Sequence, residues 1–431
     1  MEGIALTLIF LLVLFTLLGS SVWIGISLLA VAWVGMELFT TRLVGDSMAL
    51  TIWSASSSWT LTALPLFVWM GEILFRTKLS ENLFKGLQPW LHGLPGGLLH
   101  VNIAGSAIFA AICGSSAATV LTVGKMALPE LKRRKYPEKM IIGTLAGAGT
   151  LGLLIPPSII LIIYGVTVNE SIVKLFVAGI IPGIMLALLF MGYVAVWDLM
   201  GGRKDRTDTA SYTMSDRVRS LGQLAPIMLL ILSIMGSIAF GIATATEAAV
   251  LGVLGAFAIS WSQGHLTTEN FLSSLMGATR TSCMIAFILA GSTFLTLAMG
   301  FTGLPRSVAG WIAEQQLSPA MLIAVLAIFY IILGCFLDGI SSIVLTMAVV
   351  EPIARQAGFD MIWFGIFLTI VVEIAQITPP IGFNLFVLQG MTGRDMDFIA
   401  KAAIPMFLLM VLGVVLVSIF PGIATWLPSK M

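Results

Sequence analysis

The chain has 431 residues, of which 58% are apolar and only 10% are charged. Soluble domains carry roughly 25% charged residues, so this composition excludes a soluble globular enzyme and makes lipid the solvent for much of the surface. The formal net charge is +1 and no domain is strongly basic, which excludes nucleic acid as an expected partner.

Apolar segments of nearly membrane-spanning length follow one another along the whole chain. A helix that crosses the bilayer needs about 20 apolar residues, and several segments are slightly shorter. We therefore predict an all-α polytopic membrane protein. In chain order, the predicted spans are residues 4–18, 22–39, 61–75, 140–163, 172–197, 224–242, 245–261, 282–299, 362–388 and 399–419.

Two further apolar stretches are interrupted at their centres. The first covers about residues 98–131 and is broken at Gly114-Ser115-Ser116. The second covers about residues 319–354, with the apolar segment 321–336 as its first arm, and is broken around Asp338-Gly339. Each predicts a re-entrant helical hairpin, which enters and leaves the membrane on one side. Irregular backbone at that depth is tolerated only inside protein or beside a cavity, so we expect neither turn to face lipid.

The same landmarks occur twice along the chain, always at the same interval. Proline removes a backbone donor and interrupts a helix, so repeated prolines in apolar runs predict repeated helix breaks. Two copies of one pattern indicate a transporter with internal repeats, in which broken helices form the binding site. The matched pairs are Ser115 with Asp338, Pro129 with Pro352, Pro156-Pro157 with Pro379-Pro380, and Pro182 with Pro405.

Lysine and arginine predict the orientation of the two copies. They cluster at residues 132–139 and in the polar segment 198–222, and such clusters mark cytoplasmic loops. Each half then holds five crossings and one hairpin, and an odd number of crossings inverts the second half. We predict a first inverted repeat at residues 1–200 with a cytoplasm-opening hairpin, a polar cytoplasmic linker at residues 201–222, and a second repeat at residues 223–431 with a periplasm-opening hairpin.

The proline pairs predict oxygen ligands for a small cation. Two consecutive prolines remove two amide donors, so carbonyls near Gly152 and Leu153 become free acceptors in the first copy. In the second copy Thr378 adds a hydroxyl. A proline kink that only shapes packing is the alternative, and it is less favoured for two copies that each face a hairpin break.

The hairpin tips are the second group of candidates. Ser115 and Ser116 offer two hydroxyls and a helix N-terminus, which attracts anions, while the carbonyls of an unwound turn attract cations. The second tip has Asp338 where the first has Ser115. An ionisable group at that depth is a functional candidate, and an N-cap of the second arm is the other interpretation.

Three carboxylates in apolar segments keep other functions open. Glu72, Glu247 and Glu373 do not repeat at the interval of the prolines, and they are either proton relays or residues near interfaces. No phosphate-binding loop is present, so transport would use an ion gradient, the membrane potential or another subunit. A proton-coupled or antiport carrier of organic anions is one alternative. An intramembrane enzyme or assembly scaffold is the alternative of another class.

At these positions the chain resembles the large membrane subunit (the M or DctM-like subunit) of tripartite ATP-independent periplasmic (TRAP) transporters, and the resemblance covers essentially the whole chain. The motifs that carry it are Leu64-Pro65-Leu66-Phe67 with Gly71-Glu72, Gly114-Ser115-Ser116-Ala117-Ala118-Thr119, Gly152-Leu153-Leu154-Ile155-Pro156-Pro157-Ser158, Ala178-Gly179-Ile180-Ile181-Pro182-Gly183, Asp338-Gly339, and Ile377-Thr378-Pro379-Pro380-Ile381-Gly382.

The resemblance implies an elevator-type secondary transporter, not an enzyme, that imports an organic acid with sodium as coupling ion and no other cofactor. It implies one sodium site at Ser115, Ser116, Gly152, Ile155 and Pro157, and another at Gly334, Gly339, Ala375, Thr378 and Ile381. The side chains that we expect to matter most for the substrate are Ser115, Ser116, Asp338 and Thr378.

The same resemblance implies the surroundings of the protein. It predicts a multi-pass protein of the bacterial inner membrane, with the lipid bilayer as its solvent. The expected partners are a small four-helix membrane subunit, not fused to this chain, and a periplasmic solute-binding protein that delivers the substrate. C4-dicarboxylates, sugar acids and sialic acid are the expected kinds of substrate.

Overall fold

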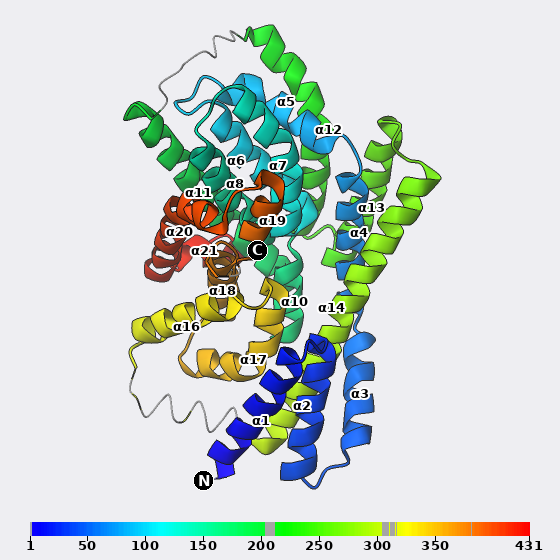
Figure 1. Ribbon diagram of the computed structural model, residues 1–431. Helices are drawn as coiled ribbons and strands as arrows, with labels where there is room; N and C mark the ends of the chain where they lie inside the picture. Colours follow the sequence, from blue (N-terminus) through cyan, green and yellow to red (C-terminus); the bar gives the residue numbers. More distant parts are fainter. Residues whose placement is uncertain (1, 203–211, 304–309, 311–314, 316, 381) are drawn as a thin grey trace.

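The computed structural model describes residues 2–202, 212–303, 310, 315, 317–380 and 382–431, and every regular element among them is a helix. Helices suit such apolar runs because a helix satisfies its own backbone hydrogen bonds without water. The first half, blue to green in Figure 1, contains α1 (Glu2–Gly19), α2 (Ile24–Phe39), α3 (Val44–Ser56), η1 (Trp59–Thr62), α4 (Ala63–Phe75), α5 (Leu79–Leu91), α6 (Leu98–Cys113), α7 (Ser116–Arg133), α8 (Glu138–Gly149), α9 (Leu151–Leu154), α10 (Ile159–Thr167) and α11 (Ile172–Leu199).

The second half follows the same order of helices. The interval from the start of α7 to the start of α17 equals the interval from the start of α8 to the start of α18. The repeated prolines are separated by the same interval. One difference is that α3 and α4 bend by 53° at their junction, whereas their counterpart α14 is a single helix of 35 residues. The helices of this half are α12 (Met214–Ala239), α13 (Ala245–Ser262), α14 (Thr268–Thr302), α16 (Pro319–Gly334), α17 (Gly339–Gln356), α18 (Met361–Gln376), α19 (Phe383–Thr392), α20 (Met396–Ile419), α21 (Gly422–Thr425) and η2 (Pro428–Lys430).

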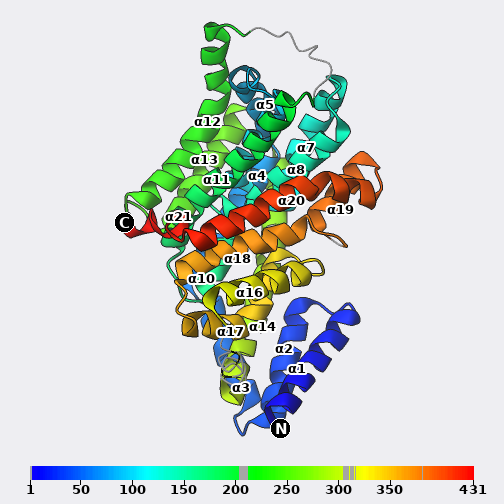
Figure 2. The ribbon, with the colours of Figure 1, turned by 90° about the vertical axis from the view of Figure 1, so that its left-hand side faces the viewer.

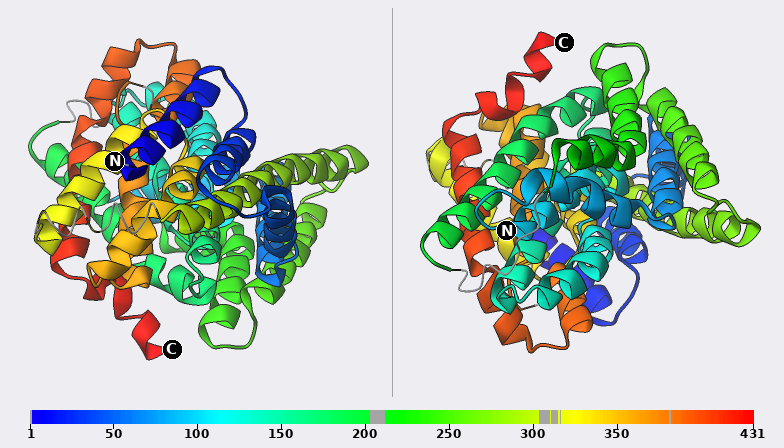
Figure 3. Two further views of the ribbon diagram at one scale, coloured as in Figure 1. Left: turned by 90° about the horizontal axis from the view of Figure 1, so that it is seen from below. Right: turned by 90° about the horizontal axis from the view of Figure 1, so that it is seen from above.

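α14 is the axis of one part of the molecule, which we call the α14 arm (α1–α4 and α12–α14). α2 and α3 pack along one end of α14, α4 lies along the other end, and α13 packs against α4 (Figure 1). The turn from α13 into α14 projects from the rest of the molecule (Figure 3). α5 contacts both α12 and α6, so it joins the arm to the other part.

The other part, which we call the hairpin domain (α6–α11 and α16–α20), is built around α18. Every residue of α18 is buried, as expected for a helix that is apolar on all sides. α16 and α20 lie against it, and Figure 2 shows the three helices side by side. α11 and α17 also contact α18, so helices of both halves enclose it.

Among the described residues, five helices are long and apolar enough to cross a membrane: α11, α12, α13, α14 and α20. The bent pairs α3–α4 and α8–α10 raise the number to seven if each pair forms one span. The second pair bends by 42° at its break. The prediction of an all-helical protein with several membrane-spanning helices therefore agrees with the structure.

Helices α3 and α5 lie in segments for which no span was predicted, and the predicted span 362–388 is divided into α18 and α19. Two further boundaries differ from the structure. α14 begins at Thr268, well before the predicted span 282–299, because its first turns carry polar residues that conceal a helix from a search for apolar runs. α12 begins at Met214, inside the predicted linker 201–222, where Thr213 and Asp216 form a capping box. Residues 203–211 of that linker lie outside the described residues.

The single prolines do not break helices, contrary to the prediction. Pro129, Pro352, Pro182 and Pro405 lie inside α7, α17, α11 and α20, which continue through them. One proline removes one donor, and neighbouring helices can satisfy the freed carbonyl. Only the proline pairs and the Ser115 and Asp338 positions coincide with breaks.

Candidate functional site at the two helix breaks

The first tip joins α6 to α7 through Gly114 and Ser115. Gly114 adopts a left-handed conformation (φ +57°), which glycine reaches without steric cost, and Ser115 is extended. The Ser115 carbonyl accepts hydrogen bonds from the Thr119 amide (3.0 Å) and hydroxyl (2.8 Å). The Ser116 side chain is buried at the start of α7.

The first broken helix lies directly against this tip. A Cβ atom on Gly152 would be 2.8 Å from the Ser115 carbonyl carbon and from the Ser116 amide nitrogen, so only glycine allows this approach. Ile155 is extended before the two buried prolines, and Ser158 caps α10. The carbonyls of Gly152 and Leu153 would normally bind the amides of residues 156 and 157, which proline lacks.

One of these two carbonyls is partly occupied. The Ser158 hydroxyl donates a hydrogen bond to the Leu153 carbonyl, so the prediction that both carbonyls are free is only partly met. A carbonyl oxygen has two lone pairs, and one remains on Leu153. The predicted residues Ser115, Ser116 and Gly152 therefore meet, and Ile155 and Pro157 follow in the same break.

A residue of the second half reaches into the first tip. The Ser116 hydroxyl donates a hydrogen bond to Oε1 of Glu373, on α18. Glu373 is only 1% exposed. The sequence singled out Glu373 as a carboxylate in an apolar segment, but gave no sign of its pairing with Ser116, since 257 residues separate the two.

The second tip joins α16 to α17 and is more open. Asp338 is exposed and caps α17, because its Oδ2 accepts hydrogen bonds from the amides of Ile340 (3.2 Å) and Ser341 (3.4 Å). A Cβ atom on Gly334 would lie 2.5 Å from the Ala375 Cβ. Asp338 thus has the N-cap role, which leaves its other oxygen available.

The second broken helix faces this tip through a thiol. The one thiol proton of Cys335 has three carbonyl acceptors within reach, those of Ile331 on its own helix at 3.1 Å, Pro379 at 3.4 Å and Thr378 at 3.7 Å. The Thr378 hydroxyl donates to the Ile374 carbonyl at 2.7 Å, so its lone pairs remain free to accept. Pro379 and Pro380 are exposed, and the predicted ligand Ile381 lies outside the described residues.

The two sets of predicted residues adjoin each other. A Cβ atom on Gly339 would lie 2.9 Å from Val372 of α18 and 3.4 Å from both Leu153 and Ile160 of the first broken helix. Elements from both halves thus meet at one place in the hairpin domain. No cluster of three or more His, Cys, Asp or Glu suited to a metal ion occurs in the described part of the chain, so a cation there would depend mainly on hydroxyls and carbonyls.

The other two candidate carboxylates have structural partners. Glu72 forms an ion pair with Arg76, whose guanidinium also donates to Ser273 Oγ of α14 at 3.1 Å. Glu247 caps α13 by accepting from the Thr244 amide and hydroxyl, each at 2.8 Å. Of the three carboxylates, Glu373 alone is buried beside a tip.

A cavity of about 1460 Å³ lies beside the second tip, between the α1–α2 turn, α14 and the α16–α17 hairpin. Its walls include Trp23, Phe287 and Phe336. Arg280 is the one charged residue among the described residues that line it. The sequence missed Arg280 because the predicted span began after it, whereas the structure places it inside α14.

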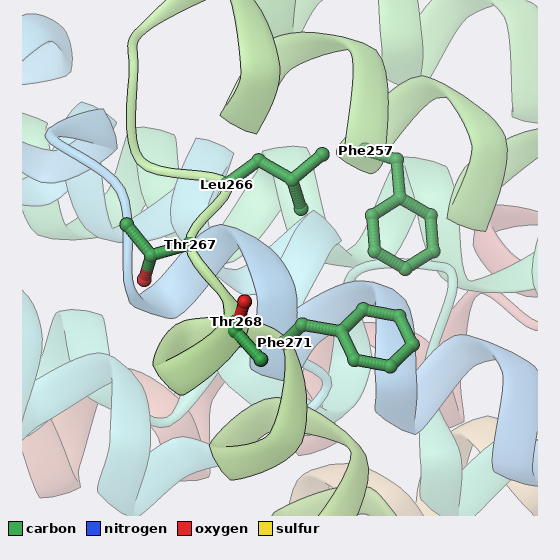
Figure 4. Close-up of a pocket in the computed structure, with 5 residues that line it drawn as sticks. All are labelled: Phe257, Leu266, Thr267, Thr268 and Phe271. Atoms are coloured by element: carbon green, nitrogen blue, oxygen red, sulfur yellow. The ribbon is translucent and has the colours of Figure 1, made fainter.

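A second hollow contains none of the predicted site residues and no charged residue among those that line it. It lies at the turn between α13 and α14 and is lined by Leu266, Thr267, Thr268 and the rings of Phe257 and Phe271 (Figure 4). Trp69 packs edge-on against both rings, at 5.2 and 5.9 Å between centroids. This hollow therefore belongs to the aromatic packing of the α14 arm, and none of its residues was predicted to bind a ligand.

Ion pairs also join each hairpin to the other half of the chain at the end opposite its tip, which we call the open end of the hairpin. At the end of the first, Lys132 lies 2.9 Å from Glu138, which also accepts from Arg394 in the α19–α20 turn. At the end of the second, Arg355 donates to the Val168 carbonyl at 2.9 Å and lies 3.7 Å from Glu170, in the α10–α11 turn.

The fold is shared with a solved transporter. The structure resembles the YdaH transporter of Alcanivorax borkumensis with a TM-score of 0.66, over 93% of this chain and 97% of that one, at 11% identity. At that identity the likeness concerns the fold alone. The chain therefore has the fold of an all-helical membrane transporter.

Sequence comparison identifies the family. Residues 10–423 match the family described as "Tripartite ATP-independent periplasmic transporter, DctM component". The C4-dicarboxylate TRAP transporter large permease protein DctM of Pseudomonas aeruginosa is 31% identical over 89% of each chain. The 2,3-diketo-L-gulonate TRAP transporter large permease protein YiaN of Escherichia coli is 29% identical, also over 89% of each. The chain belongs to the DctM family of TRAP transporters.

Membership confirms two predictions from the sequence and the general part of a third. The chain is a transporter permease and not an enzyme. It is a multi-pass protein of the inner membrane. Permeases of this family work with a small membrane subunit and a periplasmic binding protein.

Proposed function

We propose that this permease imports an organic acid together with sodium ions, by an elevator movement, after a periplasmic binding protein delivers the substrate. The observation that carries the proposal is the meeting of two oxygen-rich helix breaks, one from each half, around α18. Broken helices at a repeat interface are the usual binding sites of secondary transporters. The relatives' names support an organic acid as substrate.

The chemistry of the breaks supports sodium as the coupling ion. A hard cation prefers carbonyl, hydroxyl and carboxylate oxygens, and both breaks are rich in these. The first proposed sodium site comprises Ser115, Ser116, Gly152, Ile155 and Pro157. The second comprises Gly334, Gly339, Ala375, Thr378 and Ile381.

The substrate would lie between the tips, near Ser115, Ser116, Asp338 and Thr378. The cavity beside the second tip supports an approach from the α14 arm, and Arg280 supports an anion there. A guanidinium pairs with a carboxylate through two parallel hydrogen bonds. Arg280 makes no ion pair with another described residue, so its charge is available for an acid.

The ion pairs at the hairpin ends support opposite orientations of the two hairpins. Lys132 shares Glu138 with Arg394, and both basic residues belong to segments assigned to the cytoplasm. Arg355 instead contacts the α10–α11 turn, which carries no basic residue between positions 163 and 172. In the proposed elevator, the hairpin domain moves and the α14 arm stays fixed against the small subunit.

The test uses the permease with its small subunit in proteoliposomes, together with the binding protein. Radiolabelled succinate serves as the C4-dicarboxylate probe and gluconate as the sugar-acid probe. We expect uptake of one probe to require an inward sodium gradient. Equal uptake with potassium in place of sodium would refute sodium coupling, and uptake of neither acid would refute succinate and gluconate as substrates.

Thr378→Val tests the second sodium site. Valine keeps the shape of threonine but removes the hydroxyl oxygen, so we expect the sodium concentration for half-maximal uptake to rise about tenfold, equivalent to about 1.4 kcal/mol. Thr392→Val is the matched control, because the Thr392 hydroxyl also donates to the carbonyl four residues earlier at 2.7 Å. An unchanged sodium dependence in Thr378→Val would remove this residue from the site.

A proton-coupled carrier is the second candidate, and the burial of Glu373 beside Ser116 favours it. Buried carboxylates in membrane segments often serve as proton relays. Uptake driven by a proton gradient in the absence of sodium would support this candidate over the first.

A further inference from the structure

Glu373 places a buried carboxylate at the first tip. It lies on α18, whose residues are all buried, and one of its oxygens accepts the hydrogen bond from Ser116. The other oxygen, Oε2, is buried and has no hydrogen-bond partner among the described residues. A buried carboxylate normally has a partner for each oxygen or a cation beside it, because burial of an isolated charge is costly.

We propose that Glu373 is a ligand of the cation in the first site, contributed by the second half of the chain to the break of the first half. This inference rests on the proposed sodium coupling and goes beyond the residues assigned to that site. The carboxylate supplies the one negative charge that a sodium ion needs in a low-dielectric interior. Ser116 and the carbonyls freed by the proline pair supply neutral oxygens.

The surroundings of the carboxylate fit a cation. Glu373 contacts the first tip through Ser116, and Gly152 lies against the main chain of Ser115 and Ser116. A hydroxyl of α7 and a carboxylate of α18 therefore meet at the first tip, beside Gly152 of α9.

The position that matches Glu373 in the first half has a different role. It is held by Thr150, which donates its hydroxyl to the Gly147 carbonyl at 2.6 Å and has no carboxylate. The two breaks are thus unequal in charge. The first receives a carboxylate across the repeat interface, whereas the second has Asp338 on its own tip.

A cation held in this way would fasten the first tip to α18. Without the cation, Ser116 alone joins the tip to the carboxylate. With the cation, the tip, the broken helix and α18 share one ion. Binding of sodium would then close the first tip and preorganise the hairpin domain before it moves.

The experiment measures sodium binding without substrate, on the permease purified with its small subunit. The thermal midpoint is recorded against sodium concentration, with potassium as the ionic-strength control. A ligand that binds only the folded state stabilises it by RT ln(1 + c/Kd), where c is the free ligand concentration, so the half-saturating sodium concentration follows from a fit of the midpoints to this relation. For Glu373→Gln, which keeps an oxygen to accept from Ser116 but removes the charge, we expect the half-saturating sodium concentration to rise at least about tenfold.

Three variants make the result decisive. Glu247→Gln is the matched control, since it makes the same substitution at an exposed capping residue, and its sodium titration should equal that of the wild type. Glu373→Asp keeps the charge on a shorter side chain, and Ser116→Ala removes the neighbouring hydroxyl. We expect both to weaken sodium binding, and they remain informative if Glu373→Gln does not fold.

The outcomes separate this inference from the proposed function. If the wild type shows no sodium-specific shift and no sodium-dependent uptake, the proposed coupling itself fails. If the wild type responds to sodium and Glu373→Gln gives the same sodium titration, Glu373 is not a ligand. If Glu373→Gln does not fold, the same conclusion follows when both Glu373→Asp and Ser116→Ala titrate like the wild type.

Discussion

The two hairpin tips occupy matching positions in the chain, yet one is closed and the other is open. In the first, Ser116 and both prolines of the broken helix are buried. In the second, Asp338 and both prolines are exposed, and Phe336 is 63% exposed beside the cavity. The two copies of the hairpin tip and its broken helix therefore differ in how far their residues are exposed.

The difference shows which contacts close a tip. The first tip packs against its glycine-bearing broken helix and receives Glu373 from the other half. The second tip touches its broken helix through the Cys335 thiol and Gly334. A transporter that alternates access needs one closed and one open path, and this arrangement fits that need.

The largest effect is expected from disturbing the contact at the first tip. A methyl group on Gly152 would lie 2.8 Å from main-chain atoms of the tip, and main chain cannot yield as a flexible side chain would. We expect Gly152→Ala to lower uptake about 100-fold, as a displacement of about 1 Å in a binding site can do. Gly236→Ala is the control, because that position on α12 has open space around it.

A smaller but more direct effect concerns accessibility. Cys113 and Phe336 occupy matching positions in the two repeats, at the closed and the open tip. In a variant without Cys283 and Cys335, we expect Phe336→Cys to react with a membrane-impermeant maleimide at least roughly ten times faster than Cys113, because exposure controls thiol reactivity. Equal rates would contradict the difference between the tips.

Local chemistry made the breaks predictable from the sequence. The pairs Pro156-Pro157 and Pro379-Pro380 remove consecutive donors, so a helix cannot continue whatever surrounds it. Gly114 and the capping Asp338 mark turns for similarly local reasons. The resemblance to the permease family added the expected roles of these residues, and the comparison confirmed the family itself.

Features that depend on distant parts of the chain were not predictable in this way. Pro129 and Pro182 were expected to interrupt helices, but packing against neighbours allows α7 and α11 to continue. The hydrogen bond between Ser116 and Glu373 joins the two halves, and no local pattern encodes it. Arg280 was missed because polar residues at the start of α14 concealed the length of that helix.

Arg280 provides the next test of the open tip. Arg280 is the one charged residue among the described residues that line the cavity beside that tip. If the acid enters through this cavity, loss of the guanidinium weakens the attraction of its carboxylate. We expect Arg280→Gln to raise the substrate concentration for half-maximal uptake about tenfold, at unchanged sodium dependence. Lys174→Gln, at an exposed position on α11, controls for the loss of one positive charge. Equal substrate dependence in the two variants would exclude Arg280 from the path of the acid.

The smallest effect is expected at the open ends of the hairpins, where the two halves differ less than at the tips. Arg394 joins Glu138 at one end and Arg355 joins Glu170 at the other, and both arginines are exposed. Exposed ion pairs contribute little to stability, so Arg394→Gln and Arg355→Gln should each lower the thermal midpoint by no more than about 2 °C. The shift should disappear in about 1 M salt, which screens exposed charges within a few ångströms. A large loss of stability in Arg394→Gln alone would show that the halves differ at their ends as well, and that the closed tip is held partly from outside the site.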